Sequence, residues 1–404
     1  MTTLPKLDDK NANYVLEMAE TVVEKTDNRR AGSSGEEQAR HLFLNEIMKY
    51  CDEVSESNFI TNPGAGTAMH KFLCIVLIIC VLLFSLSVNG GHIAPSAISL
   101  ILSLIVFGIF SYKFLFDGTK LDFFKPKKKS GNIMGKRYSR ADTEMRVVLT
   151  SHIDAPQSYR SLILGNRWPL VLSIGSLIGN TLLFCSQLAF LFSGAPAGQP
   201  GFEFVRILCL LFIPIYIIGI FIVNPRVCSS GISASLIPSA TILSVMKQFS
   251  EDSFRYEKTE FCFLITGAEY SSRAGAYAFA KKYRRLFSDV PTVFISLEEI
   301  TTSEHLSVFF RDGSGEKGST EIASVIAQAA ENLEINLSKE NSFMGSAAFT
   351  PFATQNFSAC SLGTSKKNIS KTVSPNEDKI TAVRRKTVCD VAELIIETLN
   401  YYDS

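Results

Sequence analysis

Four long runs of apolar residues interrupt this chain, and they lie in two close pairs. The runs cover residues 72–88, 93–112, 168–193 and 207–223. A helix needs about 20 apolar residues to cross a bilayer, and burying four such runs inside a soluble domain would require a very large core. We therefore predict four membrane-spanning helices in two hairpins, with a kink at Pro214 in the fourth.

Basic residues flank the runs at the ends away from the hairpin turns, and the turns contain only Arg206. The flanking residues are Lys71, Lys113, Lys120, Lys125, Lys127, Lys128, Lys129, Arg167 and Arg226. The positive-inside rule then predicts a multi-pass protein of the cell membrane with both termini in the cytoplasm. The N-terminal segment is polar and acidic, so we do not interpret it as a cleavable signal peptide. The run KPKKK is most simply a solvated charge run, and contact with anionic lipid headgroups is the alternative.

Outside the apolar runs, short strands alternate with amphipathic helices. Helices are predicted at 11–25, 36–50, 232–249, 273–287, 320–333 and 378–401, and strands at 145–150, 260–266, 292–297, 306–310 and 359–362. This alternation predicts an α/β fold with a mixed, mostly parallel sheet and helices on both faces. The segment GSSGEE is typical of a helix cap, Pro238 is expected in a first helical turn or in the loop before it, and Lys125 to Arg140 is the predicted flexible segment.

The predicted hairpins divide the chain into five parts. Residues 1–70 form the N-terminal helical part of the α/β domain, and 71–117 form the first hairpin. Residues 118–166 contain the strand that ends in His152, 167–224 form the second hairpin, and 225–404 complete the α/β domain.

Composition excludes few classes of function. The net charge is +1, which gives no electrostatic footprint for nucleic-acid binding, and we predict no nucleic-acid partner. The nine cysteines include no Cys-x-x-Cys pair, so we interpret them as reduced packing residues rather than a disulfide framework or a cysteine zinc site.

Candidate metal-binding groups stand just after three of the predicted strands. His152 and Asp154 follow the first, Glu269 follows the strand FCFLITG, and Glu298 follows TVFISL. In a parallel sheet the carboxyl ends of the strands share one edge. Imidazole and carboxylate groups can hold zinc, and a free carboxylate can take a proton from bound water. The pattern indicates a hydrolytic metal site.

The sequence here resembles the co-catalytic zinc aminopeptidases of clan MH, which include bacterial leucyl aminopeptidases and glutamate carboxypeptidase relatives. The segments that carry the resemblance are RRAGSSGEEQAR, VVLTSHIDA, SSGISASLIPSATILSVMKQF, FLITGAEYSSRAGAYAFA and TVFISLEE. The resemblance implies that His152 is a zinc ligand supported by Asp154, that Glu269 is the general base, and that Glu298 stands at a second ligand position where the family has Asp.

The chain departs from the family at the remaining metal ligands. Ala234 occupies the position of the bridging Asp, and Tyr270 that of a ligand glutamate. The last ligand, a His, is expected near 370–372, but no His follows His305. The implied zinc would be held weakly or not at all, unless Glu377 or Asp378 replaces the missing ligand.

Two hypotheses about function follow. In the first, the protein is a membrane-anchored pseudo-peptidase that binds peptides or protein partners. In the second, it is an atypical zinc-dependent aminopeptidase that releases N-terminal residues from peptides. The missing metal ligands favour the first hypothesis, and the retention of His152, Asp154 and Glu269 favours the second.

Overall fold

The computed structural model describes residues 9–116, 127–159, 168–221, 223–313, 315–341, 347–365 and 378–404. The chain divides into two compact units. We call the first the sheet unit, which comprises residues 1–63, 126–157 and 226–404. We call the second the helical unit, which comprises residues 64–125 and 158–225.

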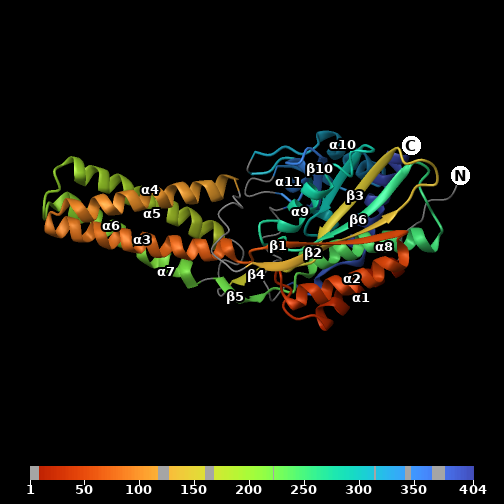
Figure 1. Ribbon diagram of the computed structural model, residues 1–404, viewed down its shortest axis with the longest axis horizontal. Coiled ribbons are helices and arrows are strands. Elements are labelled where there is room, and N and C mark those ends of the chain that lie inside the picture. The colour runs from red at the N-terminus through yellow and green to blue at the C-terminus, as the bar shows by residue number, and fades with distance from the viewer. Residues whose placement is uncertain are drawn as a thin grey trace. The chain divides into compact units, whose positions relative to one another are not determined.

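The sheet unit is built on one eight-stranded sheet in the order β1-β2-β6-β3-β7-β10-β8-β9 (Figure 1). Its strands are β1 (Glu53–Thr61), β2 (Lys128–Arg137), β3 (Met145–His152), β6 (Thr259–Thr266), β7 (Thr292–Leu297), β8 (Leu306–Phe309), β9 (Leu337–Glu340) and β10 (Ser358–Thr364). The four central strands β6, β3, β7 and β10 are parallel. Their carboxyl ends therefore lie at one edge, which is where the predicted site residues were expected.

Helices cover both faces of the sheet. One apolar core packs α1 (Asp9–Lys25), α2 (Ser34–Tyr50), α8 (Ile237–Glu251), α10 (Thr320–Asn332) and α13 (Arg385–Asp403) against it. A second core on the other face holds α9 (Ala274–Tyr283) and α11 (Thr350–Ala353). Strand β3 shows the period of two: Val147 and Leu149 enter the first core, and Val148 enters the second. The predicted mixed, mostly parallel α/β fold is confirmed.

Local signals agree with the helix starts. Ser33 caps α2 by accepting a hydrogen bond from the Glu36 amide, as the segment GSSGEE predicts. Pro238 lies in the first turn of α8, one of the two places expected for it. The turn before it, Ile232–Leu236 (η3), is a single π-helical turn that the sequence pattern did not reveal.

The prediction that Lys125 to Arg140 is flexible is wrong for its described part. Residues 128–137 form β2, which pairs with β1 on one side and with β6 on the other. The segment KKSGNIMGKR lacks both an apolar run and strict alternation, so its strand is specified by its partners rather than by its own residues. Strands β1 and β2 were both absent from the sequence-based prediction. Residues 125 and 126 lie outside the described part.

The described residues of the helical unit include four helices long and apolar enough to cross a membrane. They are Ala65–Gly90 (α3), Ile93–Tyr112 within α4 (Ile93–Phe116), Val171–Phe192 within α5 (Trp168–Phe192), and Pro200–Phe221. The last is divided into α6 (Pro200–Leu210) and α7 (Ile213–Phe221), and Pro214 in the first turn of α7 accounts for the break. A two-stranded sheet joins β4 (Gln157–Tyr159) and β5 (Val223–Cys228).

Candidate functional site

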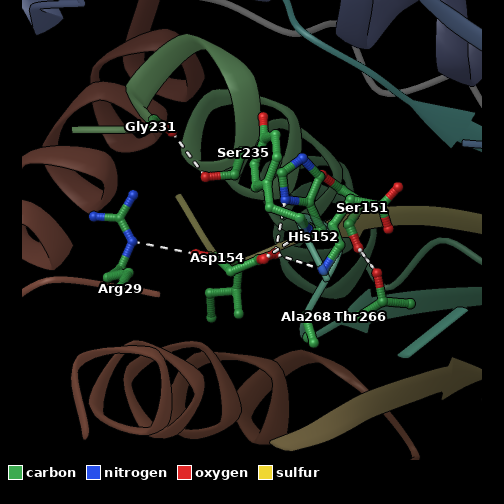
Figure 2. A network of polar contacts seen from close by, with 12 residues as sticks. Arg29, Ser151, His152, Asp154, Gly231, Ser235, Thr266 and Ala268 are labelled. Atoms are coloured by element: carbon green, nitrogen blue, oxygen red, sulfur yellow. Dashed lines mark hydrogen bonds and ion pairs between the residues drawn. The ribbon is translucent and has the colours of Figure 1, made fainter. Parts of the chain in front are cut away.

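His152 is the last residue of β3, and Asp154 follows it at the edge of the sheet (Figure 2). Both are buried, and the Asp154 side chain has no exposed surface. His152 Nδ1 lies 3.2 Å from Asp154 Oδ1. Because a carboxylate only accepts, Nδ1 is the donor, and in the neutral ring Nε2 is left as the acceptor. This orientation is the one in which an imidazole can bind a metal through Nε2.

The carboxylate of Asp154 also holds the loop that follows β6. Oδ1 accepts a hydrogen bond from the Glu269 amide at 3.0 Å, and Oδ2 accepts one from the Tyr270 amide at 2.9 Å. With the bond from His152, both oxygens are occupied by protein donors. Asp154 therefore fixes the end of β3 to the end of β6.

The side chains of the β6 loop turn toward one another and toward His152. Glu269 forms an ion pair with Arg273 at 3.0 Å, and it is mostly buried. The ring of Tyr270 meets the ring of His152 edge to face, with centroids 5.4 Å apart. Ala268 and Arg273 have φ values of 57° and 51°, in the left-handed region that non-glycine residues rarely adopt. Such backbone strain is typical of functional loops.

Glu298, which follows β7, is engaged elsewhere. Its Oε1 accepts a hydrogen bond from the Ala348 amide at 3.0 Å, at the segment that leads into α11. The charge of Glu298 contributes to a raised pKa of Glu269, so the two carboxyl groups lie in the same neighbourhood. The structure thus brings His152, Asp154, Glu269 and Tyr270 into contact, and it places Glu298 nearby on a different partner.

Two buried groups from the N-terminal segment complete the site, and sequence reasoning gave neither a role. Arg29 Nε donates to the Ile153 carbonyl at 3.2 Å. Glu36, in the first turn of α2, accepts hydrogen bonds from the Gly32 amide, the Ser130 hydroxyl and the Ala268 amide at 2.6, 2.9 and 2.7 Å. An acidic residue in a first helical turn is normally a solvated complement to the helix dipole, so the sequence carried no signal of this burial.

Asp378 acts as a cap for η3. Its Oδ2 accepts hydrogen bonds from the Ile232 amide at 3.0 Å and the Ser230 hydroxyl at 2.8 Å, and its Oδ1 accepts from the Ser233 amide and hydroxyl at 3.0 and 2.8 Å. Ala234, at the position of the bridging Asp in the resembled family, lies in the same turn. Four donors occupy the two oxygens of Asp378. Glu377 and the segment 370–372 lie outside the described residues.

Burial shifts the pKa values of titratable groups at the carboxyl edge of the sheet. It raises the pKa of Glu36 to about 7, helped by the charge of Asp154 and opposed by the three hydrogen bonds. Burial also raises the pKa of Glu269, against the charges of Arg273 and His152. For His152, burial lowers the pKa, but the hydrogen bond and charge of Asp154 outweigh burial, so its pKa lies above the ordinary value.

The donor set does not fit a zinc centre in the described part of the chain. Within the described ranges, no three His, Cys, Asp or Glu side chains form a group that could hold a metal ion. The carboxylates of Asp154, Asp378 and Glu36 each accept at least three hydrogen bonds from protein donors. A catalytic zinc normally takes three protein ligands and an open position. Of the groups described above, the Nε2 atom of His152 is the one oriented as a ligand would be.

Comparisons with known proteins agree with the fold. The model of peptidase family M28 matches residues 228–399, which is less than half of the chain. No curated protein sequence matches it.

Among solved structures, the chain resembles a Zn-dependent exopeptidase from Parabacteroides distasonis, with 11% identity, a TM-score of 0.55 and 98% of each chain covered. It also resembles the zinc aminopeptidase BSAP from Bacillus subtilis, with 12% identity, a TM-score of 0.54, and 97% of this chain and 95% of that one covered. A third similar structure is an Acidobacteriales bacterium glutaminyl cyclase, with 8% identity, a TM-score of 0.55, and 97% and 94% covered. The sheet unit therefore has the fold shared by M28-type zinc exopeptidases and glutaminyl cyclases.

We expect Asp154→Asn to destabilise the protein by about 1–3 kcal/mol. The substitution replaces one carboxylate oxygen by an NH2 group, which would face the backbone N–H of Glu269 or Tyr270 and leave it unsatisfied. Thermal unfolding of the full chain in detergent measures the effect. Asp142→Asn, at an exposed position, is the matched control and should leave the midpoint unchanged. Equal midpoints for both variants would contradict the role of Asp154 as the clamp between the strand ends.

We also expect stability to fall as the pH rises from about 5 to 8. Glu36, Glu269 and His152 all have folded pKa values above their ordinary ones, so the folded state holds more protons than the unfolded state in this range. The rise from 4.5 to about 7 at Glu36 corresponds alone to about 3 kcal/mol. Unfolding midpoints across this range should show the fall, and Glu36→Gln should reduce its slope. Stability that increases from pH 5 to 8 would contradict this assignment.

Proposed function

We propose that this protein is a membrane-anchored pseudo-peptidase of the M28 type. In this proposal the sheet unit binds peptides or protein segments at the carboxyl edge of its sheet and does not hydrolyse them. The observation that supports this proposal most is that potential metal ligands at that edge are replaced or are already hydrogen-bonded to the protein. Asp378, which could have replaced the missing last ligand, instead accepts hydrogen bonds from the backbone amides of η3. Ala234 and Tyr270 stand at two further ligand positions of the resembled family.

Tyr270 is the group best placed to contact a bound peptide. Its amide is fixed by Asp154, its ring is held edge to face by His152, and 44% of its surface stays exposed. A rigid aromatic ring with an exposed face supplies contact area at low entropic cost. In the resembled family this position carries a metal-ligating glutamate. In this protein a side chain suited to peptide contact takes the place of that ligand.

The membrane part of the proposal rests on the apolar helices and on charge. The four apolar helices would form two hairpins inserted between elements of the sheet unit, at 71–117 and 167–224. The basic residues near the ends of these segments favour placement of the sheet unit and both termini on the cytoplasmic side.

A second candidate function is atypical zinc-dependent peptide hydrolysis. It is favoured by the His152–Asp154 pair, whose geometry leaves Nε2 as an acceptor, and by Glu269, whose raised pKa suits a general base. Two of the similar structures are a Zn-dependent exopeptidase and a zinc aminopeptidase, so zinc is the metal to test.

Peptide binding and turnover separate the two candidates. The full chain in detergent, with zinc added, is offered an array of tetrapeptides with free N-termini. We expect binding without cleavage. Tyr270→Ser should weaken binding about tenfold, because it removes about 1.4 kcal/mol or more of aromatic contact. Tyr401→Ser, at an exposed tyrosine of α13, is the matched control and should bind as the unaltered protein does.

Cleavage that is abolished by Glu269→Gln would overturn the pseudo-peptidase proposal and support the hydrolase. Binding that survives Tyr270→Ser unchanged would show that the carboxyl edge is not the binding surface.

A further inference from the structure

A basic cavity lies in the sheet unit between α2 and the strands β1 and β2. Its volume is about 510 Å³, and its lining comes from the loop 32–34, from α2, from Asn58 and from residues 128–131. Three of its lining residues are basic, namely Arg40, Lys128 and Lys129. All of the residues that form it belong to the sheet unit.

Arg40 is built into this cavity rather than spread over the surface. Its side chain is 11% exposed, and its Nη1 donates to Asn58 Oδ1 at 3.3 Å. The guanidinium occupies the space above Gly131, where any Cβ atom would lie 1.8 Å from Nη1. Its buried Nε makes no hydrogen bond within the described residues, although Glu56 lies 3.7 Å away. A guanidinium with unused N–H groups suits a phosphate, which it can bind in a fork geometry.

The two lysines stand at the rim of the cavity. Lys128 and Lys129 are exposed, and in the described part of the chain neither is in an ion pair. The Cβ of Lys128 lies next to Gly32, which has a φ of +66° and would clash there with any side chain, at 2.7 Å. The lysine is thus set directly beside the loop that starts α2.

Two acidic residues also line the cavity, and neither cancels the basic groups. Glu36 is occupied by its three internal hydrogen bonds, and burial raises its pKa to about 7, which reduces its charge at neutral pH. Glu37 is 64% exposed and lies 3.7 Å from Arg40 Nη2, a separation at which solvent screens the pair strongly. Glu37 and Glu56 both pair with Arg40, and Glu36 is partly neutralised, so the excess of positive charge at the cavity rests on Lys128 and Lys129.

The residues that line the cavity flank the first apolar hairpin in the sequence. Three residues separate the end of β1 at Thr61 from the start of α3 at Ala65, and Lys128 follows the end of α4 at Phe116 by twelve positions. If the hairpin crosses the membrane as proposed above, a lipid headgroup is one source of phosphate to test.

We propose that the cavity formed by α2, β1 and β2 binds a phosphate-bearing anion through Arg40, Lys128 and Lys129. The ligand chemistry is a phosphate monoester or diester, carried by a lipid headgroup or by a soluble compound. In a specific site only Lys128 and Lys129 of the basic run would bind the anion, whereas a solvated charge run would attract anions without selecting among its lysines.

The test compares lysines of equal charge on the full chain. In one arm, nanodiscs of phosphatidylcholine with and without phosphatidic acid are examined by native mass spectrometry for retained lipid. In the other, inorganic phosphate and glycerol 3-phosphate are titrated calorimetrically. We expect Lys128→Gln and Lys129→Gln to weaken binding about tenfold each, as the loss of a charge-assisted hydrogen bond predicts. Lys127→Gln, a neighbour outside the cavity, should bind like the unaltered protein.

A charge-neutral variant makes the test independent of the net charge. Gly131→Ala would displace the Arg40 guanidinium and should weaken binding to a similar extent, with thermal unfolding as the check that the fold persists. Binding in the lipid arm alone would identify a headgroup as the source, and binding of the soluble phosphates would identify a free compound. Equal losses for Lys127→Gln and Lys128→Gln, or no binding in either arm, would overturn the proposal.

Discussion

The architecture of the candidate site depends on one buried carboxylate. Asp154 has no exposed surface, and it accepts three hydrogen bonds that join the end of β3 to the loop after β6. Burying a carboxylate is costly unless its oxygens accept hydrogen bonds. The three donors must therefore stay within hydrogen-bond distance of the two Asp154 oxygens. The same constraint sets the imidazole orientation of His152 and the position of the Tyr270 ring.

Hydrogen bonds between protein groups hold together the loops at the carboxyl edge of the sheet. Under the pseudo-peptidase proposal, these bonds take the place of the metal–carboxylate bonds of a dinuclear site. Asp154 binds the β6 loop, Asp378 binds η3, and Glu36 joins α2 to β2 and to Ala268. Since each carboxylate has backbone or hydroxyl donors as partners, the loops are tied together without an ion.

Much of this fold is readable from the sequence because the central parallel strands are short apolar runs rich in β-branched and aromatic residues. Segments such as VVLTSHIDA and TVFISL leave little alternative to a buried strand. The rule that parallel strands end at one edge then brings His152, Asp154 and Glu269 together. Strand β2 could not be read in the same way, because KKSGNIMGKR becomes a strand only between its partners. The roles of Glu36 and Asp378 depend on donors more than 90 positions away in the chain, apart from one local bond, and no local pattern reports such contacts.

The most direct test of the central claim is the amount of zinc bound per chain. The full-length protein is purified in detergent without chelator, and its metal content is measured alongside that of His152→Ala. This account predicts well below one zinc per chain in the unaltered protein, no change on substitution, and a folded protein in both cases. One or more zinc ions per chain, lost in His152→Ala, would contradict it and would show that the edge assembles a metal centre.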